Sequence, residues 1–168
     1  MTTTRRQFIA RSTAVLAGAA FFPGAAMASA KPSEIVGLQL YSVRDDMNKN
    51  PLGTLKQLAN MGYKHVEHAN YIDRKFYGYT AKEFRKILDD LGLKMPSGHT
   101  VMGKNHWDPI KKDFTDSWKF TVEDAAYMGQ KYVISPWMDE NMRKTYDDLG
   151  RYLDVFNQCG DLCQRFGM

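Results

Sequence analysis

Residues 55–67 read LKQLANMGYKHVE, in which a helical stretch ends at Gly62 and the apolar run Tyr63–Glu67 follows at once. The same order returns at Gly92 before Leu93–His99, at Gly129 before Tyr132–Trp137, and at Gly167 before Met168. A glycine in the left-handed conformation commonly ends a helix, and in αβ units the next strand starts directly after it. The sequence therefore predicts four βα units of a larger repeat, and we expect the chain to stop before a fifth strand.

Helix boundaries are predicted from caps and from apolar residues at helical spacing. The first helix opens at Asn50-Pro51, and the second opens with the capping box of Thr80 and Glu83. The third follows Thr115, and the fourth starts near Tyr146. The inner face is expected to carry Trp118, Val122, Ala125 and Met128 in the third helix, and Leu149, Leu153, Phe156 and Cys163 in the fourth.

The first strand is expected over Ile35–Val43, with Leu38 and Leu40 on one face and Gln39 and Tyr41 on the other. Strands that alternate with helices of about ten residues or more favour a parallel α/β sheet. No Gly-x-Gly-x-x-Gly or Walker sequence follows the first strand, so the sequence lacks the phosphate-binding loops typical of open nucleotide-binding sheets.

Polar or aromatic side chains instead stand at the carboxyl end of each expected strand: Tyr41 and Ser42, Glu67 and His68, Ser97 and His99, Ser135 and Trp137. This edge is the active-site face of a (βα)₈ barrel and also the ligand edge of open sheets. The pattern therefore predicts a site at this edge. It does not by itself distinguish a barrel from an open sheet.

The first thirty residues are predicted to be a twin-arginine signal peptide. They contain Arg5-Arg6, an Ala/Gly-rich apolar stretch from Ala14 to Phe22, and Ala28-Ser29-Ala30 as a cleavage site. The mature chain would then be Lys31–Met168, exported to the periplasm or secreted. The alternative is an uncleaved membrane anchor. The apolar stretch argues against an anchor because it is short and is followed by Pro23.

Removal of this segment changes the charge. The chain has 23 Lys and Arg residues against 19 Asp and Glu residues, and the segment contains three arginines and no acidic residue, so 20 basic residues remain against 19 acidic ones. No basic surface for nucleic acid is expected at that balance.

The two cysteines, Cys159 and Cys163, are four residues apart in a helical pattern, and we expect them to be apolar filler rather than a disulfide or metal pair.

Several motifs together resemble one family. Gly37–Asp45 reads GLQLYSVRD, and Val66–Ala69, Ser97–Thr100 and Val133–Trp137 follow in strand positions. Over Glu34–Met168 the sequence resembles the exported sugar phosphate isomerase/epimerase proteins of the xylose isomerase-like TIM barrel superfamily. The resemblance implies an eight-unit (βα)₈ barrel, present here as its N-terminal half, 31–168. It also implies a divalent metal and proton transfer next to a carbonyl of a sugar. The metal ligands of that family lie on later strands, so no residue of this sequence is assigned as a metal ligand.

Proton transfer between sugar carbons needs a carboxylate or histidine as base and groups that hold hydroxyls. Glu67 and His99 are the candidate catalytic residues, and neighbouring parallel strands about 4.8 Å apart should let the two side chains converge. We expect them to support the reaction rather than to be its primary base. Candidate substrate-binding residues are Gln39, Tyr41, His68 and Trp137, each of which has a structural alternative. His65 and His106 are interpreted as structural, and the segment 70–79 as either a loop over the site or aromatic packing on the second helix.

The function predicted from the sequence is that of a sugar or sugar phosphate isomerase or epimerase, incomplete in this chain. Its partner would be a sugar-derived substrate, with no nucleic acid and no stable membrane anchor after cleavage, and the sequence is compatible with an oligomer. Two alternatives stay open: a non-catalytic carbohydrate-binding or half-barrel assembly module, and an endonuclease-four-like phosphodiesterase.

Overall fold

The glycines that end four helices adopt the left-handed conformation that the sequence predicts. The structure is a computed structural model and describes residues 37–168. Gly62, Gly92, Gly129 and Gly167 have φ values of 97°, 65°, 78° and 78°. The residue after each glycine donates its N–H to the carbonyl five positions earlier: Tyr63 to Leu58, Leu93 to Leu88, Gln130 to Ala125 and Met168 to Cys163. This repeated C-cap turns each of the first three helices into the strand that follows.

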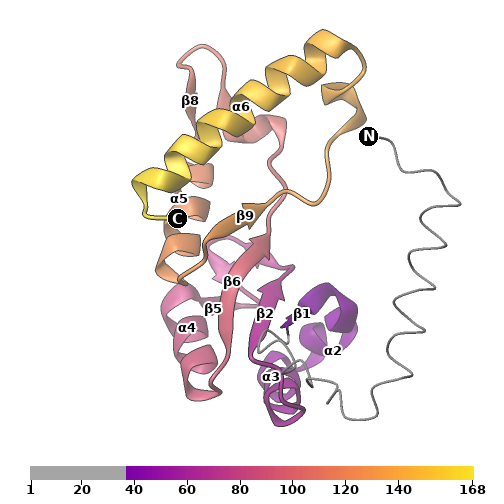
Figure 1. The fold of residues 1–168 in the computed structure, drawn as a ribbon, viewed down its shortest axis with the longest axis vertical. Helices are drawn as coiled ribbons and strands as arrows, with labels where there is room; N and C mark the ends of the chain where they lie inside the picture. Colours follow the sequence, from indigo (N-terminus) through magenta and orange to yellow (C-terminus); the bar gives the residue numbers. More distant parts are fainter. Residues whose placement is uncertain (1–36) are drawn as a thin grey trace, which may run out of the picture. The chain divides into compact units, whose positions relative to one another are not determined.

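Four parallel strands form the central sheet, in the order β1-β2-β6-β9 (Figure 1). The strands are β1 Gly37–Gln39, β2 His65–His68, β6 Lys94–His99 and β9 Tyr132–Ile134. Each strand pairs with the next one in the repeat, which is the order of a (βα)₈ barrel rather than of a doubly wound sheet. The prediction of a parallel α/β fold is confirmed.

The helices of the repeat are α3 Pro51–Asn60, α4 Ala81–Asp90, α5 Asp116–Tyr127 and α6 Tyr146–Arg165, and a short α2 Arg44–Lys49 precedes α3. The predicted caps of α3 and α4 are present: Asn50 accepts from the Gly53 N–H, and Thr80 and Glu83 form a capping box. Leu55, Phe84 and Leu88 from the helices pack with Val66 and Met95 from the strands in one buried core. The opposite face of the sheet carries the polar residues described below.

The first strand is shorter than predicted. The sequence predicts a strand to Val43, but the structure has a 3₁₀ turn, η1, over Leu40–Val43. The side chain of Gln39 accepts a hydrogen bond from the Tyr41 N–H and so caps the turn. Similarly, β9 ends at Ile134, before Ser135–Trp137. The Ser135 hydroxyl accepts from the Met102 N–H and donates to the Trp137 carbonyl. Pro136 has no N–H with which to continue the hydrogen bonds of the strand.

The segment after β2, residues 70–79, packs on α4. Of the two interpretations given for it, the structure shows aromatic packing on the second helix of the repeat. Its strands β3 Tyr71–Ile72, β4 Lys75–Phe76 and β5 Tyr79–Thr80 form an antiparallel sheet. Two-residue turns join them, with positive φ at Asp73, Arg74, Tyr77 and Gly78 as in type I′ hairpins. The rings of Phe76, Tyr77 and Tyr79 lie 5.7, 5.8 and 6.3 Å from the Phe84 ring of α4.

The buried face of α6 differs from the prediction. The structure buries Tyr152, Cys159 and Leu162, whereas Leu153 is 48% exposed. Tyr152 is buried because its hydroxyl donates to the Met102 carbonyl at 3.0 Å, which satisfies the one polar atom of its side chain. Both cysteines are free, and the Trp118 indole N–H donates to the Cys159 sulfur at 3.2 Å, so their predicted role as core filler is confirmed.

The segments after β6 and β9 complete the described fold. They comprise η2 Lys104–His106, the hairpin β7 Trp107–Asp108 and β8 Asp113–Phe114, and η3 Glu140–Met142. Among residues 37–168, no helix combines the length and the apolar composition that crossing a bilayer requires. The predicted signal peptide, residues 1–30, lies outside the described residues.

One buried carboxylate joins the β3-β5 sheet to α5. The Asp124 side chain is 8% exposed, accepts from the Tyr71 hydroxyl at 2.6 Å, and receives two hydrogen bonds from Arg74 at 2.6 and 3.0 Å. Glu123 also bonds Arg74, at 2.8 Å, but its side chain is 51% exposed. The two adjacent acids therefore share Arg74 as a partner but differ in burial, and Asp124 accepts more hydrogen bonds.

We expect Asp124→Asn to lower the free energy of unfolding by about 1–2 kcal/mol, because it weakens charge-assisted bonds at a buried site. The matched control Glu123→Gln should cost less than about 0.5 kcal/mol, because solvent screens that pair. Urea unfolding of both variants measures the difference, and equal losses would show that burial of Asp124 contributes nothing.

Candidate active site

A row of polar side chains crosses the carboxyl edge of three neighbouring strands. Gln39 of β1 is paired in register with Glu67 of β2, and Glu67 is paired with Ser97 of β6. His99 lies two residues beyond Ser97 and so faces the same side of the sheet. The register therefore places four polar side chains on one face of the sheet, the face opposite the helix-covered core.

Hydrogen bonds join all four of these residues. His99 Nε2 lies 2.9 Å from Glu67 Oε1, and the Ser97 hydroxyl donates to Glu67 Oε2 at 2.5 Å. Gln39 Nε2 lies 2.9 Å from His99 Nδ1. Strands β1 and β6 are separated by β2, so a flat sheet would hold them about 9.6 Å apart. The two long side chains therefore meet across β2, above the Glu67 side chain that lies between them.

The network fixes which nitrogen of His99 carries the proton. The Tyr41 N–H donates to Gln39 Oε1 at 2.7 Å, so the amide must present its NH₂ group to His99. His99 Nδ1 therefore accepts, and the ring proton resides on Nε2, from which it is donated to Glu67. Protonation of Nδ1 would place an N–H against the amide N–H of Gln39.

Glu67 and His99 remain open to a ligand. Their side chains are 20% and 28% exposed, so both are partly desolvated but accessible. Each carboxylate oxygen of Glu67 accepts one bond within the network and keeps a free lone pair. The predicted convergence of these two residues is confirmed, and the pair can accept a proton or orient a hydroxyl at the sheet edge.

His68 lies on the other face of β2, away from Glu67. It is 2% exposed, and its ring contacts Phe76 edge-to-face at 4.9 Å. Gly98 makes room for it, because a Cβ at that position would collide with the His68 ring. Burial lowers the pKa of His68 to about 3, so the ring stays neutral. The structure thus places His68 in the core and not with the other site candidates.

Two further candidates lie beyond the strand ends. Tyr41 belongs to η1 and is 58% exposed, and its contribution to the network is its backbone N–H. Its ring lies under the Arg44 guanidinium at 4.7 Å. Trp137 is 56% exposed in the segment after β9. Within the described part of the chain, no hydrogen bond joins either side chain to the Glu67–His99 pair.

Ser97 is the network member that the sequence analysis did not select as a site residue. Its alternation with His99 was visible, but a serine in a strand carries no chemical signature of its own. Its position opposite Glu67 depends on the β2-β6 register, which shifts between His65 and Glu67 and cannot be deduced from composition. His106 and His65 behave as interpreted: neither contacts the network.

The described residues do not form a metal centre by themselves. Between Gly37 and Met168 no group of three or more His, Cys, Asp or Glu side chains is placed to hold a metal ion. Glu67 and His99 are adjacent, but they use their facing atoms to bond each other. They fit a proton-handling pair better than a ligand set.

Comparisons with known proteins give one family and several solved structures. A family model described as "Xylose isomerase-like TIM barrel" matches residues 55–168. A sugar phosphate isomerase/epimerase from Parabacteroides distasonis is 28% identical with a TM-score of 0.60, and the alignment covers 79% of this chain and 51% of that one. A second structure with the same description and source is 24% identical with a TM-score of 0.67, covers 85% of this chain and 52% of that one, and supports the fold alone.

The chain therefore spans about half the length of the solved structures it matches. A search of curated protein sequences gives no match.

We expect the neutral Nε2–H tautomer for His99, observable from the ¹⁵N chemical shifts of its ring. Gln39→Glu should move the proton to Nδ1 or protonate both nitrogens, because a carboxylate accepts and cannot donate to Nδ1. The control Gln57→Glu, an exposed residue of α3, should leave the ring unchanged. A wild-type Nδ1–H tautomer, or the same spectrum in the Gln39 variant, would contradict the network.

Proposed function

This chain belongs to the xylose isomerase-like TIM barrel family, and on that basis we propose that the protein is a sugar isomerase or epimerase. The proposal is supported by the 28% identical structure, whose description is sugar phosphate isomerase/epimerase. Fold alone does not imply activity, so the argument depends on the site. The activity proposed is that of the whole protein, of which this chain corresponds to about half.

The observation that carries the proposal is the hydrogen-bonded pair of Glu67 and His99 at the carboxyl edge of adjacent strands. In a (βα)₈ barrel this edge is where substrates react. The pair is partly exposed, and Gln39 and Ser97 hold it in one orientation. A carboxylate that is held in one orientation is suited to accept a hydrogen bond from a substrate hydroxyl at a fixed position.

Isomerisation removes a proton from the carbon next to the carbonyl and returns one to the neighbouring carbon. Epimerisation returns it to the opposite face of the same carbon. We assign Glu67 to orient the substrate by accepting a hydrogen bond from the hydroxyl adjacent to the carbonyl. His99 keeps Glu67 in place through Nε2–H, and the other lone pairs of the carboxylate face the substrate. The primary base is not assigned to either residue.

A divalent metal is proposed for the whole protein, where it would polarise the carbonyl of the sugar. Because residues 37–168 contain no cluster of three ligating side chains, no step is assigned to a metal here. The sugar itself is proposed only by class, as a hydroxylated aldose or ketose that the polar row Gln39–Glu67–Ser97 can bind through hydroxyl groups.

In a form of the protein that is active on a ketose or aldose, Glu67→Gln and His99→Ala should each lower kcat by about tenfold or more, a loss of roughly 1.4 kcal/mol of transition-state stabilisation. Glu123→Gln, a carboxylate outside the site, is the control and should keep full turnover. Unchanged turnover in both site variants would show that the pair is part of the barrel rim and that the chemistry lies elsewhere.

Export through the twin-arginine route to the periplasm is also proposed, from Arg5-Arg6 and the Ala28–Ala30 cleavage motif. Replacement of both arginines by lysine should retain the precursor in the cytoplasm with residues 1–30 attached. Cell fractionation with N-terminal sequencing measures this, and the exported protein should begin at Lys31. Normal export of the double variant would exclude the route.

A further inference from the structure

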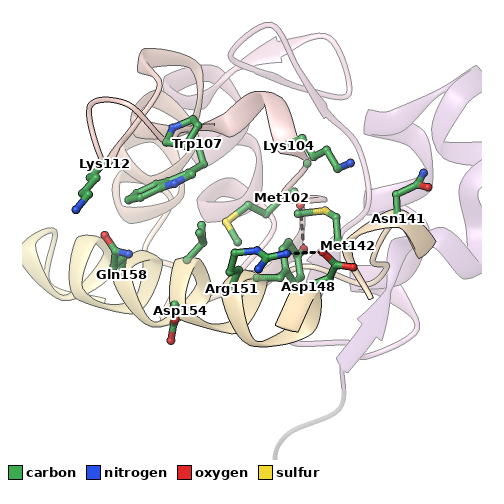
Figure 2. A pocket seen from close by; sticks show the side chains of 14 residues that line it. Met102, Lys104, Trp107, Lys112, Asn141, Met142, Asp148, Arg151, Asp154 and Gln158 are labelled. Carbon is green, nitrogen blue, oxygen red and sulfur yellow. Dashed lines mark hydrogen bonds and ion pairs between the residues drawn. The ribbon is translucent and has the colours of Figure 1, made fainter. Parts of the chain in front are cut away.

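A cavity of about 660 Å³ lies beyond the strand ends, between the segment after β6 and the N-terminal half of α6. Figure 2 shows Trp107 and Lys112 on the hairpin side and Arg151, Asp154 and Gln158 on the α6 side. The volume lies within the range of small-ligand sites. Neither the sequence analysis nor the proposed reaction uses these residues.

The floor of this cavity consists of buried residues that are joined by hydrogen bonds. Met102 and Tyr152 line it and are 2% and 3% exposed. The Tyr152 hydroxyl donates to the Met102 carbonyl at 3.0 Å, and the Met102 N–H donates to the Ser135 hydroxyl at 3.1 Å. Three segments of the fold, the loop after β6, the loop after β9 and helix α6, are therefore fastened together below the cavity.

One wall is an aromatic surface. Trp107 lines the cavity, and its ring meets the buried Phe114 edge-to-face at 4.9 Å, which holds the indole in place. An indole held in this way offers a flat apolar face to a ligand at little cost in side-chain entropy. Lys112, at the turn before Phe114, has a φ of 50°, an unfavourable conformation for a residue other than glycine.

The charges around the cavity are mixed. Lys104, Lys112 and Arg151 line it, and so do Asp148 and Asp154. Arg151 is bonded to Asp148 at 2.6 Å, so these two charges offset each other. A neutral ligand with hydroxyl groups can use both the donors and the acceptors on this rim, including Gln158.

The cavity is also close to the Glu67–His99 pair along the chain. Its floor begins at Met102, three residues after His99, so at most about 11 Å of backbone separates the two Cα atoms. The same loop thus leaves the catalytic edge and forms the cavity floor.

We propose that this cavity is a second carbohydrate subsite, in which a pyranose ring stacks on Trp107 and its hydroxyl groups bond the α6 rim. The proposal rests on the proposed function, which supplies the sugar unit that reacts at Glu67–His99. It specifies the substrate class: a glycoside of two or more sugar units, one at Glu67–His99 and the next in the cavity. The rival is a phosphate-bearing monosaccharide held by Lys104 and Lys112.

The test follows the indole N–H signals of the three tryptophans of the 168-residue protein by NMR. Cellobiose, maltose and lactose are titrated separately, and glucose 6-phosphate and inorganic phosphate serve as the rival probes. We expect at least one disaccharide to shift the Trp107 signal saturably, and Trp107→Ala to weaken its binding by about tenfold or more. Tyr127→Ala, an exposed aromatic residue of α5 outside the cavity, is the control and should leave the affinity unchanged.

A second variant avoids disturbing the Trp107–Phe114 packing. Gln158→Trp places a large side chain at the exposed α6 rim and should block disaccharide binding, whereas Gln164→Trp, exposed on the same helix outside the cavity, should not. A Trp107 shift caused only by the phosphate probes, or by no probe, would overturn the proposal.

The subsite and the reaction can fail separately. Glu67→Gln should retain the disaccharide-dependent shift of Trp107 even where turnover is lost, because the two sites use different residues. Binding at Trp107 without isomerase activity would leave the subsite standing and remove the proposed reaction. Turnover of a monosaccharide with no disaccharide effect on Trp107 would do the reverse.

Discussion

The alternation of side chains along β2 is the constraint on which both the core and the site depend. In β2, Val66 and His68 are buried under the helices while Glu67 faces the other side. A slip of one residue would exchange these sets, so that Glu67 would enter the apolar core and His68 would leave it. Because the buried set packs against Leu55, Phe84 and Leu88, burial holds the register that aligns Gln39, Glu67 and Ser97. The core therefore fixes the position of the polar row.

The same constraint explains why a histidine is tolerated in the core beside a histidine in the site. His68 remains neutral because burial lowers its pKa to about 3, and Gly98 leaves space for its ring. His99, one residue after Gly98, alternates to the polar face and bonds Glu67. The two histidines thus have opposite environments, and in the sequence only the alternation of side chains along a strand distinguishes them.

Much of the fold could be predicted from the sequence because its signals are local. The glycine C-caps, the Thr80–Glu83 capping box and the strand alternation each depend on a few neighbouring residues. Features that depend on distant partners could not be predicted. The strand ends at Gln39 and Ile134 are set by side-chain bonds to backbone, and the buried face of α6 is set by the bond of Tyr152 to Met102, fifty residues away. Leu149 and Leu153 formed an equally apolar stripe, so hydrophobicity alone did not distinguish the two faces.

The site shows the same division between local and distant information. The convergence of Glu67 and His99 follows from adjacent strands and was predictable, whereas the tautomer of His99 depends on the orientation of the Gln39 amide, which the Tyr41 N–H fixes. Tyr41, selected as a binding side chain, contributes through its backbone because the strand ends at Gln39, four residues before the predicted end at Val43. Trp107, which no strand pattern marks, lies in the β7-β8 hairpin, where its ring packs against Phe114 of the paired strand.

The two insertions after β2 and β6 have different relations to the sheet. The first, β3 to β5, packs on α4 through Phe76 and is fastened to α5 by the Arg74–Asp124 pair, so its aromatic residues are largely used for packing. The second, η2 to β8, is fastened at its base by Met102 and places Trp107 along a cavity. In a barrel the strands hold the reacting groups and the loops determine what reaches them. The second insertion therefore follows the polar edge closely, because Met102 at its base lies three residues after His99 and bonds both the loop after β9 and α6.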